Sequence, residues 1–390
     1  MPAGIVRKLR NYLNDQCFVE IEFERAFKMA KASGTPLFKN WGIDTVEDFL
    51  NYYEKFVKWV PTEEKDGRYV YNHLCLFYFV LCQSPLLGAQ SPILPTTHSP
   101  YTWLSQWVVD YAKEMGKWMD STHSINKEAI ASFGQAREYN MDDYEPVEWK
   151  TFNQFFARRL KPGRRPIDSP GDNTVIVSAA DAKFDGWWPV DDVGICTIKG
   201  VPWSIRQLLD HDGSEHVKAG FAGGKFCHSF LAPKDYHRVH APVSGTVLEA
   251  TVIDGLCHLG VVYVPETDNK PAHLKMWRTM EPKDESLKLP NHAGYQFLQA
   301  RALILIKNPV LGLVAVLPIG MAQVSSVVLS VRAGDNLEKG DEVAYFQLGG
   351  SDVVIVFQAC ANVSFDNTEK GKHYKFGQVL AVAQPNESNN

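Results

Sequence analysis

The 390 residues are 45% hydrophobic and 22% charged, the balance of an ordinary folded protein with room for two domains. A net charge of -5 and the lack of a long basic tract argue against a general nucleic-acid-binding protein. Seven cysteines with no Cys-x-x-Cys motif favour reduced thiols over a disulfide framework or a structural zinc site.

The first element expected in chain order is a short amphipathic helix. Its apolar stripe is Ile5, Val6, Leu9 and Leu13, with Arg7, Lys8 and Arg10 between them. Packing of this stripe on the rest of the domain is the favoured interpretation, and a helix lying on a membrane surface is the alternative. The N-terminus does not have the pattern of a secretory signal.

Residues 1–145 are predicted to form a helical N-terminal domain. Asp44 is expected to cap a helix with Glu47 reaching back, and an apolar stripe then repeats at helical spacing until Pro61. A second long helix is expected to begin at Ser99-Pro100. The acidic segment 142–146 makes a plausible linker to the remainder of the chain, 146–390.

From about residue 173 the pattern changes to short β-rich runs, most of them bounded by glycine or proline. The expected strands are 175–177, 245–252, 257–264, 302–306, 312–317, 323–331, 342–346 and 353–357. The chain is therefore predicted to be an α+β protein, with a helical N-terminal domain and a β-rich catalytic domain resembling a barrel or sandwich. No segment is predicted to span a membrane, because the longest unbroken apolar run has nine residues and a spanning helix needs about 20.

A glycine pair precedes Ser351 in the segment Leu348-Gly349-Gly350-Ser351. Glycine leaves the peptide before Ser351 free to adopt conformations that other residues resist. The usual interpretation of such a segment is a turn or bulge. Asp181, His240 and Ser351 together supply the three residue types needed to activate a hydroxyl, so attack by Ser351 on the Gly350 carbonyl is the alternative.

Several blocks in the chain, in their order, resemble the phosphatidylserine decarboxylases. The resemblance covers roughly 151–382, and the matching blocks are 155–163, 165–168, 178–181, 198–200, 203–204, 208–209, 235–242, 334–346 and 349–351. It implies self-cleavage between Gly350 and Ser351, which converts Ser351 into a covalent pyruvoyl cofactor. In this scheme His240 is the candidate base, because imidazole titrates near neutral pH, and Asp181 orients it.

The resemblance further implies a decarboxylase that uses this pyruvoyl group, with no pyridoxal phosphate and no metal. The pyruvoyl carbonyl condenses with a substrate amine and accepts the electrons released as CO2 departs. His237 is the candidate acid that returns a proton. As an alternative, His237 and His240 would be half of a metal site, but the sequence offers no convincing third ligand.

The substrate is an amine-bearing carboxylate, and two candidates stay open. Phosphatidylserine is the family's usual substrate and is ranked first. Two departures from the family pattern bear on this choice: Asp352 follows the serine, and the segment 319–326 is more similar to the tryptophan decarboxylase of the psilocybin pathway, a soluble relative. The similarity to this soluble relative favours a free L-amino acid, tryptophan and other aromatic ones included, as the alternative.

A third interpretation is a non-cleaving binding or scaffold protein, because 334–342 also resembles the barrels of lipoyl and biotinyl carriers. No nucleic-acid partner is expected. The resemblance implies a homodimer of cleaved protomers. The expected location is cytoplasmic, either soluble or peripherally associated with a membrane.

Overall fold

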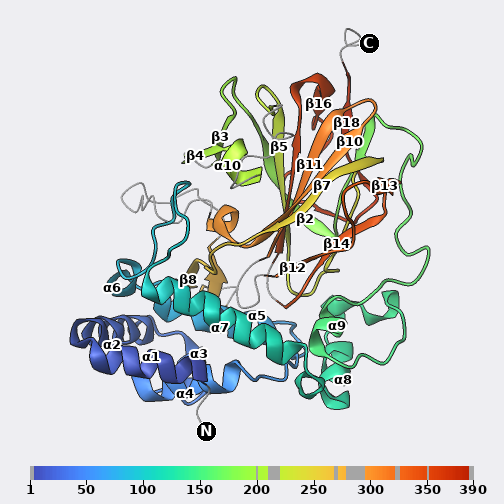
Figure 1. The fold of residues 1–390 in the computed structure, drawn as a ribbon. Coiled ribbons are helices and arrows are strands. Elements are labelled where there is room, and N and C mark those ends of the chain that lie inside the picture. Colours follow the sequence, from blue (N-terminus) through green and yellow to red (C-terminus); the bar gives the residue numbers. More distant parts are fainter. Residues whose placement is uncertain are drawn as a thin grey trace.

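The computed structural model describes residues 4–198, 201–209, 220–267, 271–277, 295–320, 326–348 and 351–385. Gly349, Gly350 and the segment 321–325 lie outside the described residues, and so does the end of the block 198–200. The described chain has helices first and strands afterwards, as predicted (Figure 1). The predicted boundary between residues 145 and 146 stays a prediction.

The N-terminal helices gather below the sheets in the view of Figure 1. They are α1 (Gly4–Asp15), α2 (Cys17–Ala32), α3 (Pro36–Asn40), α4 (Val46–Phe56), α5 (Tyr69–Leu81), α6 (Ser84–Leu87), α7 (Trp103–Met119), α8 (Lys127–Gln135) and α9 (Phe152–Phe156), with the 3₁₀ turns η1 (Thr122–Ser124), η2 (Arg137–Tyr139) and η3 (Met141–Asp143). The predicted cap of α4 is wrong by one residue: Thr45 is the N-cap, and its partner in the capping box is Asp48.

The amphipathic stripe of α1 lies inside the protein. Val6 and Leu9 are fully buried, and Trp107 of α7 donates a hydrogen bond from Nε1 to the Ile5 carbonyl. Arg10, on the polar side, is paired with Glu47 and Glu54 of α4. The favoured interpretation is confirmed, and the alternative, a stripe lying on a membrane, is wrong because that stripe is already covered by protein. Within the described residues, no helix combines the length and apolarity that crossing a bilayer requires.

The β-rich part is built on an antiparallel sheet, with smaller sheets beside it. Its order is β13 (Asn336–Leu337), β7 (Gly245–Ile253), β10 (Arg301–Asn308), β11 (Gly312–Gly320), β15 (Ser351–Phe357), β5 (Lys225–Leu231), β2 (Ala182–Pro189) and β17 (His373–Tyr374). The smaller sheets are β1 (Val175–Val177), β18 (Val379–Ala383) and β16 (Val363–Ser364); β12 (Val327–Leu329), β14 (Glu342–Phe346) and β6 (Arg238–His240); β3 (Ile195–Ile198) with β4 (Val201–Ser204); and β8 (Val261–Val264) with β9 (His273–Met276).

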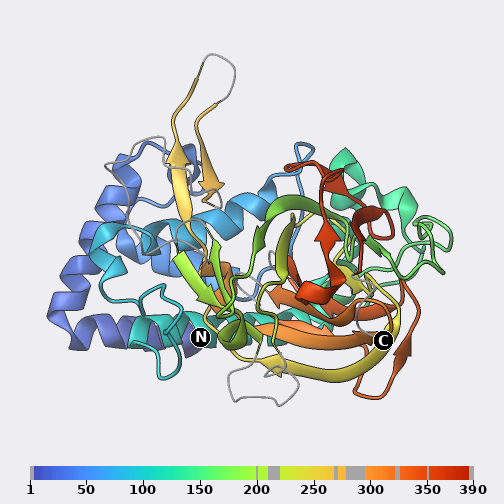
Figure 2. The ribbon, with the colours of Figure 1, turned by 90° about the horizontal axis from the view of Figure 1, so that it is seen from above.

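The described sheets do not close into a barrel. Of the predicted barrel or sandwich, the β-rich part therefore forms open, layered sheets. In the described chain, three short helical elements lie between strands: α10 (Ile205–Leu209), η6 (Tyr295–Leu298) and η7 (Ala359–Ala361). Seen from above, the gold β8–β9 hairpin projects away from the large sheet toward the helical side (Figure 2).

Strand β15 occupies the middle of the large sheet. It pairs with β11 on one side and β5 on the other along its whole length, and every residue of it is buried. A strand covered on both faces is expected to be a continuous run of β-branched and aromatic residues, which is what 353–357 is. The residue after the glycine pair is therefore the first residue of a central strand.

Candidate active site

Ser351 stands at the first position of β15, fully buried, opposite Leu231 of β5 and Gly320 of β11. Its hydroxyl lies 3.0 Å from Nδ1 of His237, on the loop that leads into β6. Two residues far apart in sequence are thus joined by the pairing of β15 in the sheet and the turn that precedes β6.

The contacts of His237 define its tautomer. Nε2 lies 3.1 Å from the Pro233 carbonyl oxygen, which only accepts hydrogen bonds, so Nε2 carries the proton. Nδ1 is then unprotonated and accepts from the Ser351 hydroxyl. The ring also stacks on Phe156, with centroids 3.9 Å apart. Burial, assisted by the nearby Arg158 cation, lowers the pKa of His237 to about 3, so the ring is a neutral base at physiological pH.

His240 carries its proton on the other ring nitrogen and meets a different hydroxyl. Its Nδ1 donates to the Gly340 carbonyl at 2.7 Å, and its Nε2 accepts from the Tyr236 hydroxyl at 3.1 Å. Phe376 stacks almost parallel on the ring at 3.7 Å. Burial lowers the pKa of His240 to about 4. The predicted pairing of His240 with Ser351 is not found among the described contacts: His237 takes that position.

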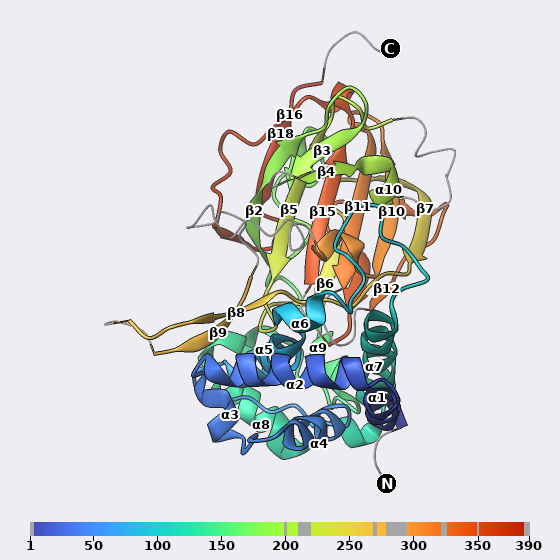
Figure 3. The ribbon, with the colours of Figure 1, turned by 90° about the vertical axis from the view of Figure 1, so that its left-hand side faces the viewer.

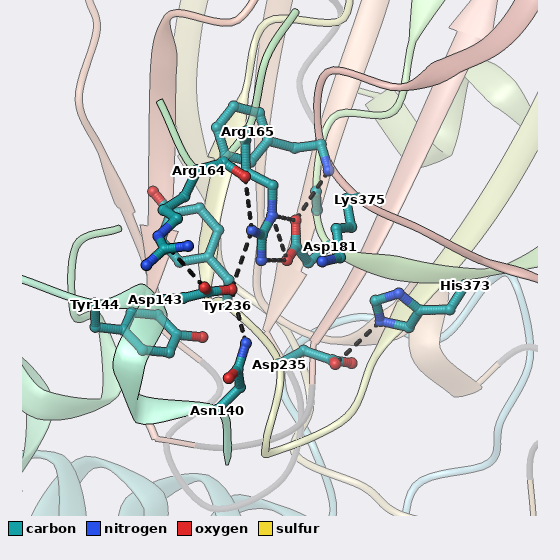
Figure 4. Close-up of polar contacts among 12 residues, drawn as sticks. Asn140, Asp143, Tyr144, Arg164, Arg165, Asp181, Asp235, Tyr236, His373 and Lys375 are labelled. Atoms are coloured by element: carbon teal, nitrogen blue, oxygen red, sulfur yellow. Dashed lines mark hydrogen bonds and ion pairs between the residues drawn. The ribbon is translucent and has the colours of Figure 1, made fainter. Parts of the chain in front are cut away.

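Asp181 lies beside this group, and Figure 4 shows its partners. Both of its oxygens accept hydrogen bonds from Arg165, the shortest at 2.6 Å, and Oδ1 also accepts from the Phe376 backbone amide at 2.9 Å. Arg165 reaches Asp143 as well, at 3.3 Å. Asp181 therefore meets His240 through Phe376, whose ring covers the imidazole, and not by the direct hydrogen bond that the sequence predicts.

The structure thus gathers the four predicted site residues into two adjoining pairs, Ser351 with His237 and Asp181 with His240. The supporting residues Arg165, Tyr236 and Phe376 were not predicted as parts of the site. Arg165 and Tyr236 lie within blocks that resemble the family, and this signal pointed toward them. Phe376 lies in none of those blocks and had no such signal.

The carboxylate after the serine is matched by a histidine. Asp352 Oδ1 lies 2.8 Å from Nε2 of His228 on β5, and both side chains are almost wholly buried. Nδ1 of the same ring lies 3.4 Å from Oδ2 of Asp185. The carboxylate that the sequence places beside residue 351 therefore has a buried histidine as its hydrogen-bond partner.

His237 and His240 do not converge on a common ligand, since each of their ring nitrogens faces a different protein group. No cluster of three metal-binding side chains occurs in the part of the chain that the structure describes. The site does fit a cofactor made from Ser351. Its hydroxyl is buried against an unprotonated nitrogen, and its backbone is already fixed by two strands. Residue 351 itself would hold the pyruvoyl group, with His237 beside it.

Comparison with known proteins shows the family to which this chain belongs. The sequence profile of the phosphatidylserine decarboxylase family matches residues 152–382, more than half of the chain, so the protein belongs to that family. The match begins at α9 and takes in Asp181, His237, His240 and Ser351. The family resemblance expected from the sequence is confirmed.

Individual relatives are moderately similar. Phosphatidylserine decarboxylase proenzyme 3 of Schizosaccharomyces pombe is 31% identical over 247 residues, which are 63% of this chain and 22% of that protein. Decarboxylase iboD of Amanita muscaria is 29% identical over 246 residues, 60% of this chain and 65% of that protein. The phosphatidylserine decarboxylase proenzyme of Fusobacterium nucleatum is 30% identical over 257 residues, 65% of this chain and 73% of that protein. The chain thus covers less than two thirds of the length of the first two relatives.

Proposed function

We propose that this protein is a pyruvoyl-dependent decarboxylase that matures by cleaving itself before Ser351, with phosphatidylserine as its first-ranked substrate. The observation that carries the proposal is the buried contact between Ser351 Oγ and Nδ1 of His237 at the head of a central strand. Membership of the family supports the reaction type, and the word proenzyme in the names of two relatives is consistent with maturation from a precursor.

In the proposed maturation, Ser351 Oγ adds to the Gly350 carbonyl carbon while an imidazole takes the hydroxyl proton. The ester that replaces the peptide bond is broken by elimination across Cα–Cβ of residue 351, and hydrolysis of the dehydroalanine releases ammonia and leaves a pyruvoyl group. The contacts favour His237 as the base, while the family resemblance favours His240. Held at Gly340, His240 also steadies the turn between β13 and β14, upstream of the glycine pair.

In turnover, the pyruvoyl group supplies the carbonyl that a substrate amine joins and that draws electrons as CO2 leaves. His237 lies beside residue 351 and is placed to exchange a proton there. Its burial keeps bulk water away from that exchange. The homodimer and the cytoplasmic location remain predictions.

The test combines intact mass, a denaturing gel and CO2 release. Purified protein should run as two chains, the smaller starting at residue 351 with a blocked N-terminus, and Ser351→Ala should stay a single chain. Splitting of Ser351→Ala at the same bond would exclude the serine as nucleophile. A wild-type protein that never splits would favour the non-cleaving binding protein.

A free amino acid is the second candidate substrate. The observation that favours it is the burial of the α1 stripe, since this removes the membrane contact that the sequence offered. CO2 release should therefore be compared among phosphatidylserine vesicles, serine, tryptophan and tyrosine. Turnover of tryptophan or tyrosine without turnover of phosphatidylserine would reverse the ranking.

A further inference from the structure

A cavity of about 310 Å³ lies where the N-terminal helices meet the β-rich part. Its wall combines Arg68 at the start of α5, Glu138 of η2, Pro233 and Lys234 before β6, and His273 and Lys275 of β9. Figure 3 shows the β8–β9 hairpin beside α5, which brings these distant segments together. A cavity of this size is at the small end of the range of ligand sites.

Some charged groups that line this cavity have an ion-pair partner, and others have none among the described residues. Lys234 is paired with Glu138 at 2.7 Å. For Arg68 and Lys275, no ion pair is found with any described residue. His273 and Lys275 are two apart on β9 and so extend to the same side of the strand, while Leu274 and Met276 are buried on the other. Arg68 and Lys275 therefore border the cavity without an ion-pair partner among the described residues.

A third cation is buried behind the same wall. Arg158 is 1% exposed, and its Nη2 donates to the Lys234 carbonyl and to the Tyr144 hydroxyl, both at 3.2 Å. Its Nε and Nη1 have no hydrogen-bond partner among the described groups. A buried cation that lacks a matching carboxylate leaves the surrounding space at a positive potential, which favours an incoming anion.

The cavity is next to the reactive residue. Pro233 lines it, and the carbonyl of Pro233 holds Nε2 of His237, whose other nitrogen meets Ser351. The carboxylate that leaves as CO2 must sit at residue 351 itself. An anion in the cavity, beyond His237, would therefore be a second acidic group of the same substrate. A phosphodiester head group carries such a group, and a free aromatic amino acid does not.

We propose that Arg68, Lys234 and Lys275 form a binding site for the phosphate oxyanion of the substrate, so that the N-terminal helical region and the β8–β9 hairpin complete the substrate site. This inference rests on the proposed function, and it gives the N-terminal region a direct part in substrate recognition.

The experiment measures binding by calorimetry, which does not depend on turnover. Purified protein is titrated with sn-glycero-3-phospho-L-serine, inorganic phosphate and L-tryptophan. Arg68→Gln and Lys275→Gln should each weaken binding of the phosphodiester about tenfold or more, the range for loss of a charge-assisted hydrogen bond. Inorganic phosphate should compete for the same site. Lys275→Arg, which keeps the charge, should restore most of the affinity, and Lys370→Gln, an exposed lysine elsewhere, should leave it unchanged.

Unchanged phosphodiester affinity in the Arg68→Gln/Lys275→Gln double variant, with its melting temperature preserved, would overturn the proposal. Equal loss in Lys370→Gln would overturn it too, because the effect would then be one of net charge. Binding of tryptophan in place of the phosphodiester, lost in the same variants, would contradict the assigned ligand. Cleavage on a denaturing gel is scored in parallel, so failure to mature would count against the proposed function while leaving the binding result readable.

Discussion

In each imidazole of the site, a hydrogen bond to one backbone carbonyl determines which ring nitrogen carries the proton. Pro233 holds the proton of His237 on Nε2, and Gly340 holds that of His240 on Nδ1. Each ring therefore presents one unprotonated nitrogen, toward the Ser351 hydroxyl in one case and the Tyr236 hydroxyl in the other. The two histidines are therefore opposite tautomers, and they also differ in the hydroxyl that each one meets.

Replacing the two histidines should separate their contributions. His237→Ala should lose turnover by about 10²–10⁴-fold, because no other described imidazole contacts residue 351. His240→Ala should mature slowly or remain one chain, since it frees the Gly340 turn upstream of the cleavage site. Gels and CO2 release measure both effects. Full turnover by His237→Ala would contradict its place in the chemistry, and an uncleaved His237→Ala would identify it as the base.

The pair formed by Asp352 and His228 should behave as one buried unit. In the uncleaved Ser351→Ala background, His228→Leu should lower the free energy of unfolding by about 3–5 kcal/mol, because it removes the ring that pairs with a buried carboxylate. The double variant His228→Leu/Asp352→Val should recover most of that loss, since two apolar residues leave no unmatched charge. Urea unfolding measures four proteins: the parent, His228→Leu, Asp352→Val and the double variant. Additive losses in the double variant would show that the pair is not coupled.

At the scale of elements, the burial of the α1 stripe predicts a contribution to folding stability and not to membrane binding. Leu9 is fully buried, so Leu9→Ala in the Ser351→Ala background should lower the free energy of unfolding by about 2–5 kcal/mol. Phe18, on α2, is 74% exposed, and Phe18→Ala should change it by less than about 0.5 kcal/mol. An unfolding curve for Leu9→Ala that matches the parent protein would contradict the packing of α1.

Most apolar runs predicted a strand, although the apolar run of β18 was missed, and so were strands built from mixed residues. The predicted strands β1, β7, β10, β11, β14 and β15 all form, and of the predicted run 257–264 only the second half does, as β8. Strands β5 and β2 were not predicted, because His228, Ser229 and Asp185 interrupt their apolar pattern. These polar groups are tolerated in the interior since neighbouring strands supply partners, as Asp352 does for His228.

At the site too, the sequence pattern did not show which side chains would meet in the folded chain. Residue type, residue order and the family resemblance together proposed Asp181, His237, His240 and Ser351 as site residues, but they did not determine which histidine meets the serine. Two histidines three residues apart fit either assignment until the loop containing Pro233 is folded, because that loop turns the His237 ring toward β15. The partner of Asp181 was equally open, since Arg165 becomes its neighbour only in the folded chain.

For the whole molecule, three buried histidines predict a loss of stability in mild acid. Burial lowers the pKa of His73 to about 3, of His237 to about 3 and of His240 to about 4, from an ordinary value of 6.5. Below about pH 6.5 the unfolded chain therefore binds more protons than the folded one, and stability falls as the pH falls toward 4. At about pH 5 this is on the order of 2 kcal/mol for each histidine.

Urea unfolding of Ser351→Ala at neutral pH and at about pH 5 measures this loss. His73 offers a specific check, because neither of its ring nitrogens has a hydrogen-bond partner among the described residues. His73→Phe should retain the free energy of unfolding at neutral pH. It should also reduce the acid-induced loss of that free energy by the contribution of one histidine. An acid dependence identical to that of the parent would contradict this origin.

The central position of β15 has a consequence for the lifetime of the mature protein. In the proposed maturation, the cut before Ser351 leaves a shorter product that still supplies a middle strand of the large sheet, held between β5 and β11. It cannot leave without opening that sheet, yet if the sheet does open, reassembly requires an encounter between two separate molecules. Each protein molecule therefore folds once, before it is cleaved. The precursor folds and unfolds reversibly. The lifetime of the active form is instead set by the rate at which its sheet first opens.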